Sequence, residues 1–125
     1  MVITQYPHYI YVLEETSEAR QLKNGDWVPG EQAWVSYGNA REETNGRGSV
    51  YRAEDYCNIV TTALVQCPTS CQTIEEGATI LVSSARIDPH VTEDQIKNLR
   101  KTGIVRVTGT CKKFDRTSMH CRVWL

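Results

Sequence analysis

The cysteine thiols are the side chains of this chain best suited to chemistry, because a thiol can bind a metal, form a disulfide or act as a nucleophile. Cys67 and Cys71 are separated by the three residues PTS in a chain of 125 residues. Structural zinc sites combine two tighter cysteine pairs or add histidines, and no histidine stands at ligand spacing here. The sequence therefore predicts no metal and no cofactor.

We interpret the five cysteines as thiols of a reducing compartment rather than as disulfides. Their number is odd, which leaves at least one of them outside any set of pairs. Cys111 and Cys121 both alternate with apolar residues. They are predicted to face one another across a hairpin as small packed side chains.

Acid–base and nucleophilic residues show no catalytic arrangement. The three histidines lie in unrelated segments, and the sequence places no serine or cysteine beside a base. Paired carboxylates occur at Glu14–Glu15, Glu42–Glu43 and Glu75–Glu76. Neighbours on a strand point to opposite faces, so these doublets are typical of solvated turns. We expect a protein that is not an enzyme.

A long polar segment, residues 41–56, interrupts a chain whose other segments resemble strands. It reads REETNGRGSVYRAEDY. Its NGRG stretch could form an anion-binding turn, but the Lys-Ser/Thr ending of a P-loop is missing. Positive and negative charges nearly balance, which disfavours a DNA clamp and suits a loop that pairs with other copies of the chain. The candidate channel and oligomerisation residues are Arg41, Glu42, Glu43, Asn45, Gly46, Arg47, Gly48, Arg52, Glu54 and Asp55.

The bulk composition is that of one ordinary globular domain, residues 1–125. Hydrophobic residues make up 40% and charged residues 23%, with a formal net charge of −1. Proteins that grip phosphates carry a basic surplus, so tight nucleic-acid binding is not predicted. No stretch approaches the ~18 apolar residues of a membrane span. The N-terminal MVITQYPHYIYVL has no signal-peptide pattern, so we expect synthesis in the cytoplasm.

The elements that must position these residues are mainly strands. The pattern predicts a small antiparallel barrel or sandwich of about five to six strands. Residues 8–15 alternate as a first strand, NGDW at 24–27 is a hairpin signal, and Pro29 demotes the next segment to an edge or a bulge. Residues 57–68 are predicted to be one central strand, apolar on both faces. A further strand covers residues 79–83, and residues 103–125 are predicted to be a final hairpin with its turn at DRTS.

One short helix is predicted at about residues 92–102, within an insertion at about residues 85–103. Thr92 can cap it and Gln95 completes a capping box, while Gly103 is placed to end it. Ile96 and Leu99 give it one narrow apolar stripe. So short a helix needs tertiary support, so we expect it to dock on the sheet.

Aromatic residues concentrate in the first third of the chain and leave two interpretations open. They could stack the bases of single-stranded nucleic acid in an OB-like or SH3-like barrel. They could also fill the core and an interface, which the lack of a basic surplus favours. The residues concerned are Tyr6, Tyr9, Tyr11, Trp27, Trp34 and Tyr37.

The order of these features resembles the head–tail joining proteins of tailed bacteriophages, also called head-completion, stopper or adaptor proteins. It consists of the NGDW turn, a tryptophan-bearing strand, the segment NAREETNGRG, a central strand, and a terminal hairpin containing VTGTCKKFD and CRVW. The likeness covers most of the chain. The segment 85–103 looks like an insertion between two strands of that family.

The resemblance implies a phage or prophage structural protein at the head–tail connector of the virion. It implies a β-barrel that assembles as a homo-oligomeric ring of about twelve copies, with portal or adaptor and tail proteins as partners. The loop at about residues 38–56 would project into the channel and help close it. Packaged double-stranded DNA would pass through the channel without sequence-specific binding. No membrane is expected as a partner. Tail terminator and tail-tube proteins, which also form rings, stay an alternative.

Overall fold

The computed structural model describes residues 6–28, 30–43, 49–52, 58–61 and 63–125. Within these residues the chain is mainly β with one short helix, as the sequence predicts. The elements in chain order are β1 (His8–Glu15), β2 (Arg20–Gln21), β3 (Trp27–Val28), β4 (Gln32–Glu42), β5 (Ser49–Arg52), β6 (Asn58–Thr61), β7 (Leu64–Cys67), β8 (Thr79–Ser83), α1 (Glu93–Lys101), β9 (Val105–Thr110), β10 (Lys113–Arg116) and β11 (Cys121–Trp124).

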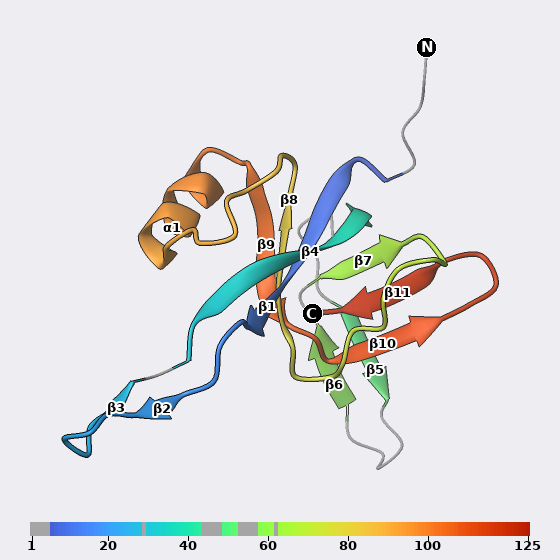
Figure 1. The fold of residues 1–125 in the computed structure, drawn as a ribbon. Coiled ribbons are helices and arrows are strands. Elements are labelled where there is room, and N and C mark those ends of the chain that lie inside the picture. The colour runs from blue at the N-terminus through green and yellow to red at the C-terminus, as the bar shows by residue number, and fades with distance from the viewer. Residues whose placement is uncertain (1–5, 29, 44–48, 53–57, 62) are drawn as a thin grey trace.

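Seven of the strands form one antiparallel sheet in the order β10-β11-β7-β4-β1-β8-β9 (Figure 1). The edge strands β9 and β10 follow one another in the chain, linked by Cys111 and Lys112. They do not pair with each other in the described ladders, so the predicted barrel is not closed, and the strand number exceeds the predicted five to six. Because β9 leads directly into β10, the two edges of the sheet lie close together although no ladder joins them.

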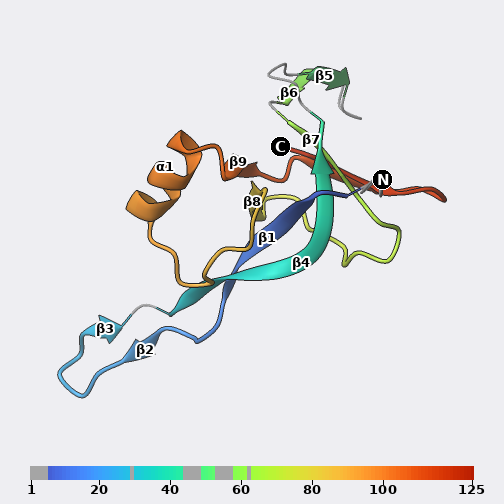
Figure 2. The ribbon, with the colours of Figure 1, turned by 90° about the horizontal axis from the view of Figure 1, so that it is seen from above.

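The long strand β4 joins the two halves of this sheet. Residues 32–40 pair with β1, whereas Arg41 and Glu42 pair with β7. The β1–β4 register shifts between Tyr9 and Tyr11, and Gly38 on β4 has a φ of 105°. A bulge with a left-handed glycine bends a strand sharply. Figure 2 shows the resulting curve of β4 around the body.

Strands β2 and β3 form a separate hairpin that projects from the sheet (Figures 1 and 2). The predicted NGDW turn is confirmed, because Gly25 has a φ of 91° and the Leu22 N–H donates to the Asp26 carbonyl at 2.7 Å. Glycine tolerates this positive φ without steric cost. Pro29 lies outside the described residues.

The predicted single strand at residues 57–68 is wrong. Strand β6 pairs with β5 in a two-stranded ladder of its own, whereas β7 pairs with β4 and β11. Between them, the Leu125 N–H donates to the Ala63 carbonyl at 2.9 Å, and the Ala63 N–H donates back at 3.3 Å. These two bonds to Leu125 hold Ala63 between β6 and β7. The apolar pattern of the sequence continues through this position and gives no sign of the division.

The predicted final hairpin is too long. Strand β9 pairs with β8 along Val105–Thr110, and only β10 and β11 form the terminal hairpin. Its turn follows β10, which still includes Asp115 and Arg116, so the turn predicted at DRTS is placed about two residues too early. The Thr117 N–H donates to the His120 carbonyl at 3.0 Å and closes this turn. Cys111 precedes the hairpin and does not face Cys121 across it, because Cys121 pairs with Arg116.

Two hydrophobic clusters lie on opposite faces of β1 and β8. Ile10, Val12, Ile80 and Val82 belong to the larger cluster, which β7 and β11 also enter. Tyr11, Trp34, Leu81 and Val105 form the smaller one, against which Ile96 and Leu99 of α1 pack. This division follows the alternation of side chains along a strand. The prediction that the helix docks on the sheet is therefore confirmed.

The helix begins and ends where the sequence predicts. The Gln95 N–H donates to Thr92 Oγ1 at 3.2 Å, and the Thr92 N–H donates to Gln95 Oε1 at 2.9 Å, which completes the capping box. Gly103 follows the helix with a φ of 84°. These local bonds satisfy amide groups that a helix terminus leaves without partners.

Candidate functional site

The predicted channel residues divide between the end of β4 and the segment beyond it. Arg41 and Glu42 belong to β4 and Glu43 follows directly, so the strand covers part of the loop predicted at residues 38–56. Arg52 belongs to β5, and its side chain is not among those described. The remaining predicted residues lie outside the described residues: Asn45, Gly46, Arg47, Gly48, Glu54 and Asp55.

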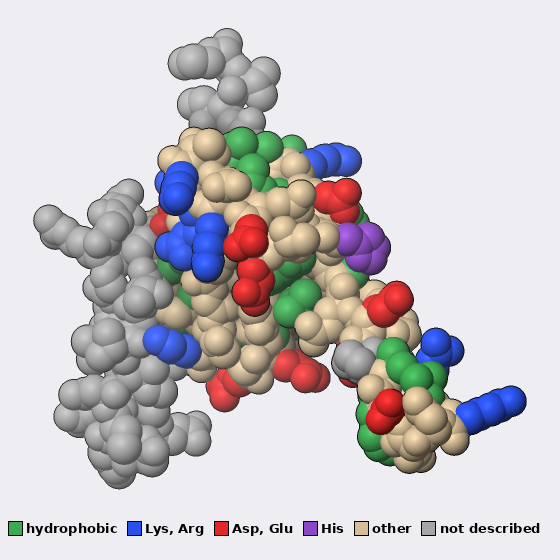
Figure 3. Space-filling model, turned by 90° about the vertical axis from the view of Figure 1, so that its left-hand side faces the viewer, with side chains coloured by type: hydrophobic (Ala, Val, Ile, Leu, Met, Phe, Trp, Pro, Cys, Tyr) green, Lys and Arg blue, Asp and Glu red, His purple; other side chains and the backbone are tan. Residues whose placement is uncertain are grey.

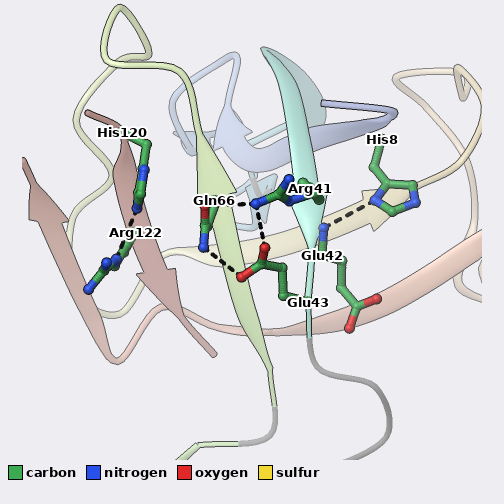
Figure 4. A network of polar contacts seen from close by, with 7 residues as sticks. All are labelled: His8, Arg41, Glu42, Glu43, Gln66, His120 and Arg122. Atoms are coloured by element: carbon green, nitrogen blue, oxygen red, sulfur yellow. Dashed lines mark hydrogen bonds and ion pairs between the residues drawn. The ribbon is translucent and has the colours of Figure 1, made fainter. Parts of the chain in front are cut away.

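Arg41 and Glu43 meet on one face of the sheet, with Gln66 of β7 between them (Figure 4). An Arg41 Nη2 atom lies 2.5 Å from Glu43 Oε1 and donates to Gln66 Oε1 at 3.2 Å. The amide of Gln66 donates to Glu43 Oε2 at 2.5 Å. Arg41 and Gln66 are register partners, so strand pairing brings the three side chains together. The Arg41–Glu43 ion pair is therefore formed within one chain.

Glu42 points to the opposite face and pairs with Arg106 of β9. Arg106 donates to Glu42 Oε2 from Nε at 3.2 Å and from Nη2 at 3.1 Å. The Glu42 side chain is only 8% exposed, whereas that of Arg106 is 41% exposed. A two-pronged guanidinium contact with a nearly buried carboxylate is stronger than an ordinary surface ion pair. This contact ties the end of β4 to the far edge of the sheet.

His8 completes this corner of the molecule. Its Nδ1 atom accepts a hydrogen bond from the Glu42 backbone N–H at 3.1 Å (Figure 4). Burial lowers the pKa of His8 from its ordinary value of 6.5, and the positive charge of Arg106 lowers it further, while the Glu42 carboxylate acts in the opposite direction. The neutral imidazole is therefore the form that the fold holds, because only that form can accept at Nδ1.

We expect acid to weaken the fold through His8. Its pKa is lower in the folded than in the unfolded chain, so the unfolded chain binds the proton more readily. The free energy of unfolding is then highest above the ordinary pKa of 6.5 and falls as the pH drops from that value toward the lowered folded pKa. Urea unfolding of wild type and His8→Asn across about pH 5 to 8 measures this contribution.

The His8→Asn variant keeps a carbonyl acceptor but loses the titrating ring. Its free energy of unfolding should vary less with pH between about 5 and 7 than that of the wild type. His90→Asn serves as the matched control, because His90 is exposed and lies in the loop before α1. A His8→Asn profile that runs parallel to the wild-type and His90→Asn profiles would contradict this assignment.

The β2–β3 hairpin is the second candidate site, and it is one of interaction rather than chemistry. Trp27 is 67% exposed and Leu22 is 41% exposed. Figure 3 shows this hairpin standing out at the lower right of the body, with hydrophobic and basic side chains on its surface. The sequence predicts that the aromatic residues fill the core and an interface; Tyr11 and Trp34 are buried, whereas Trp27 is exposed, and whether it lies in an interface stays a prediction.

The base of this hairpin is held firmly while its tip extends away. The Thr16 N–H donates to the Glu31 carbonyl at 2.7 Å, and the Glu31 N–H donates to Ser17 Oγ at 2.8 Å. Gly30 lies so close that a side chain there would collide with the Ser17 carbonyl and the Glu15 carboxylate. A projection fixed at its base presents its apolar tip at a defined position, which is what an interface residue requires.

The described part of the chain contains neither a candidate metal cluster nor a candidate membrane-spanning helix. No three His, Cys, Asp or Glu side chains gather there in a way that could hold a metal ion. No helix there is long and apolar enough to cross a bilayer. Comparison with protein-family models, with curated proteins and with solved structures finds no match to this chain.

Proposed function

We propose that this chain is a ring-forming structural protein of the head–tail connector in a tailed phage or prophage. Copies synthesised in the host cytoplasm assemble at the connector, join the portal to the tail and help close the DNA channel. The order of the sequence motifs supports the choice of family. The observation that carries the ring itself is the β2–β3 hairpin, which pairs with no strand of the seven-stranded sheet in the described ladders.

A projecting hairpin suits a ring because it can reach a neighbouring copy. Trp27 exposes 67% of its surface in the isolated chain, and an interface would remove that apolar surface from water. Head-to-tail contacts between identical copies close into rings when their rotation fits. Each copy then donates one hairpin and receives another, so a modest contact is repeated at every interface around the ring.

The polar segment after β4 suits the channel side of this proposal. Strands β5 and β6 pair only with one another among the described ladders, over four register pairs from Ser49↔Thr61 to Arg52↔Asn58. A hairpin that contributes no strand to the main sheet is available for contacts outside its own body. Inter-subunit pairing of Arg47 and Arg52 with acidic residues of a neighbour stays a prediction.

Electron microscopy of intact particles tests this proposal. The protein, labelled by a small C-terminal tag, is expected as a ring between portal and tail, with about twelvefold symmetry. A sixfold ring on the tail side would instead favour a tail terminator or tail-tube protein. Absence of the tag from purified particles, together with salt-dependent binding of single-stranded DNA by the purified chain, would replace the proposal with the nucleic-acid-binding alternative.

A further inference from the structure

Three cysteines from distant parts of the chain gather at one end of the larger core. Cys67 on β7 and Cys121 on β11 are register partners in adjacent antiparallel strands. Both are fully buried, and Cys71, in the loop after β7, packs against the same cluster. The thiols of Cys67 and Cys121 both act on the Cys71 thiol and lower its pKa. All three are free thiols in this structure.

Cys71 is the member of this group that a small molecule can reach. It is half-buried, and it lines a surface cavity of about 290 Å³ beside Ser36, Asn39 and Gln72. The Cys71 N–H donates to the Pro68 carbonyl at 3.0 Å, which folds the loop back toward the end of β7. Cys71 therefore lies between a polar cavity and two buried cysteines.

Arg116 of β10 holds this loop and places a positive charge beside it. Its guanidinium donates to the Cys71 carbonyl at 2.8 Å, to Thr73 Oγ1 at 3.2 Å, and to the Thr69 carbonyl. The same guanidinium lies over the Phe114 ring, 5.6 Å from its centroid. A fixed cation close to a thiol stabilises its thiolate, which is the nucleophilic form.

The electrostatics divide the three thiols into one that ionises and two that stay protonated. The hydrogen bond from Cys67 lowers the pKa of Cys71 to about 6 against the effect of burial, and Cys121 and Arg116 act in the same direction as Cys67. The pKa of Cys67 is raised by its hydrogen bond to Cys71 and by burial, and that of Cys121 is raised by burial. One reactive thiolate beside protonated thiols is the arrangement of a redox-sensitive pair.

We propose that Cys71 is a site of covalent modification by peroxides, and that Cys67 then closes a disulfide with it. The Cys71 thiolate attacks one oxygen of hydrogen peroxide, the O–O bond breaks, and hydroxide leaves as Cys71 sulfenic acid forms. The Cys67 sulfur attacks the sulfenic sulfur, its proton joins the departing hydroxyl, and water leaves. Two thiols lose two electrons and one peroxide is reduced to two waters.

Cys67 is the expected partner because it ends β7, only four positions before Cys71 in the chain. The two cysteines also flank a short loop that the Cys71–Pro68 bond already closes. This site depends on neither the ring nor the connector, since every residue in it belongs to one chain.

The test treats the full-length protein with hydrogen peroxide and follows the loss of free thiols, with Cys57→Ser as the common background. Cys71→Ser is expected to slow thiol loss about tenfold or more, because the remaining thiols are buried and protonated. Cys111→Ser is the matched control and should leave the rate unchanged. Cys111 is buried, Arg116 does not act on its thiol, and burial raises its pKa to about 11.

Peptide mapping identifies the bond that forms. Trypsin should release residues 53–86, which contain both Cys67 and Cys71, as one peptide lighter by two hydrogens. A cross-link to the peptide 117–122 would show that Cys121 is the partner and overturn the pairing. Unchanged thiol loss in Cys71→Ser would overturn the site. Iodoacetamide labelling of the Cys57→Ser protein, where Cys71 should react before Cys67, Cys111 and Cys121, repeats the test with every residue of the site intact.

Discussion

In the proposed ring, replacing Trp27 with alanine is expected to remove most of the contact between neighbouring copies. The side chain is 67% exposed at the end of a hairpin that contributes no strand to the main sheet. Tryptophans at the centre of interfaces commonly contribute about 2 kcal/mol or more, which corresponds to roughly 30-fold in affinity. Because the contact recurs at every interface of a ring, the variant should fail to assemble where the wild type succeeds.

A competition experiment measures this effect directly. Wild-type and Trp27→Ala chains that carry different tags are produced together during particle assembly, and their ratio in purified particles is compared with their ratio in the cell extract. The variant should be depleted by roughly 30-fold, as expected from the lost contact. Circular dichroism and thermal unfolding of the purified variant show whether its fold is intact, because an exposed side chain contributes little to stability.

Met119→Ala is the matched control for this experiment. Met119 is 79% exposed, in the turn between β10 and β11, and thus offers a comparable apolar surface in a different part of the chain. It should enter particles as well as the wild type. Equal incorporation of Trp27→Ala would show that the hairpin is not the contact between copies, and equal depletion of Met119→Ala would show that the effect is not specific to the hairpin.

The second large effect is expected in the core, where Ile80→Ala should lower the free energy of unfolding by about 2–5 kcal/mol. Ile80 is fully buried in the larger cluster, and its strand lies between β1 and β9, with Val12 and Gly109 as register partners. Truncation there removes buried methyl groups and leaves a cavity that close-packed neighbours fill only in part. Urea unfolding at neutral pH measures the loss.

Two controls separate the cavity from other effects at this position. Ile80→Val removes one methylene group and should cost about 0.5–1.5 kcal/mol. Leu22→Ala changes an exposed residue of the hairpin and should stay within about 0.5 kcal/mol of the wild type. If Ile80→Ala cost no more than Leu22→Ala, β8 would not occupy the centre of a packed core.

Several features of this fold were predictable because they depend on residues close together in the chain. The first strand at residues 8–15, the NGDW turn and the strand at residues 79–83 all carry their signal within a few residues. The capping box of Thr92 and Gln95 likewise needs only one helical turn. Alternation of apolar side chains shows which residues of a strand are buried together, but it does not name the partner strand.

The candidate site was predictable only in part. Arg41, Glu42 and Glu43 were recognised as a charged group, but the sequence placed them in a loop facing other copies. The structure pairs Arg41 with Glu43 and connects Glu42 to Arg106, a residue 64 positions along the chain. The sequence shows which charged residues are present. Which of them form ion pairs depends on the order of the strands, because that order decides which distant residues lie close together.

Local patterns along the chain were enough to predict the class of the fold, the NGDW turn and the limits of the helix, because those follow from backbone preferences and short-range hydrogen bonds. Packing of distant segments, in contrast, divides the strand predicted at residues 57–68 between two ladders, pairs β9 with β8, and brings three cysteines together at one end of the core. Backbone amide and carbonyl groups are the same in every strand, so any alternating segment can pair with another. The choice of partner is made when all the apolar faces are buried together.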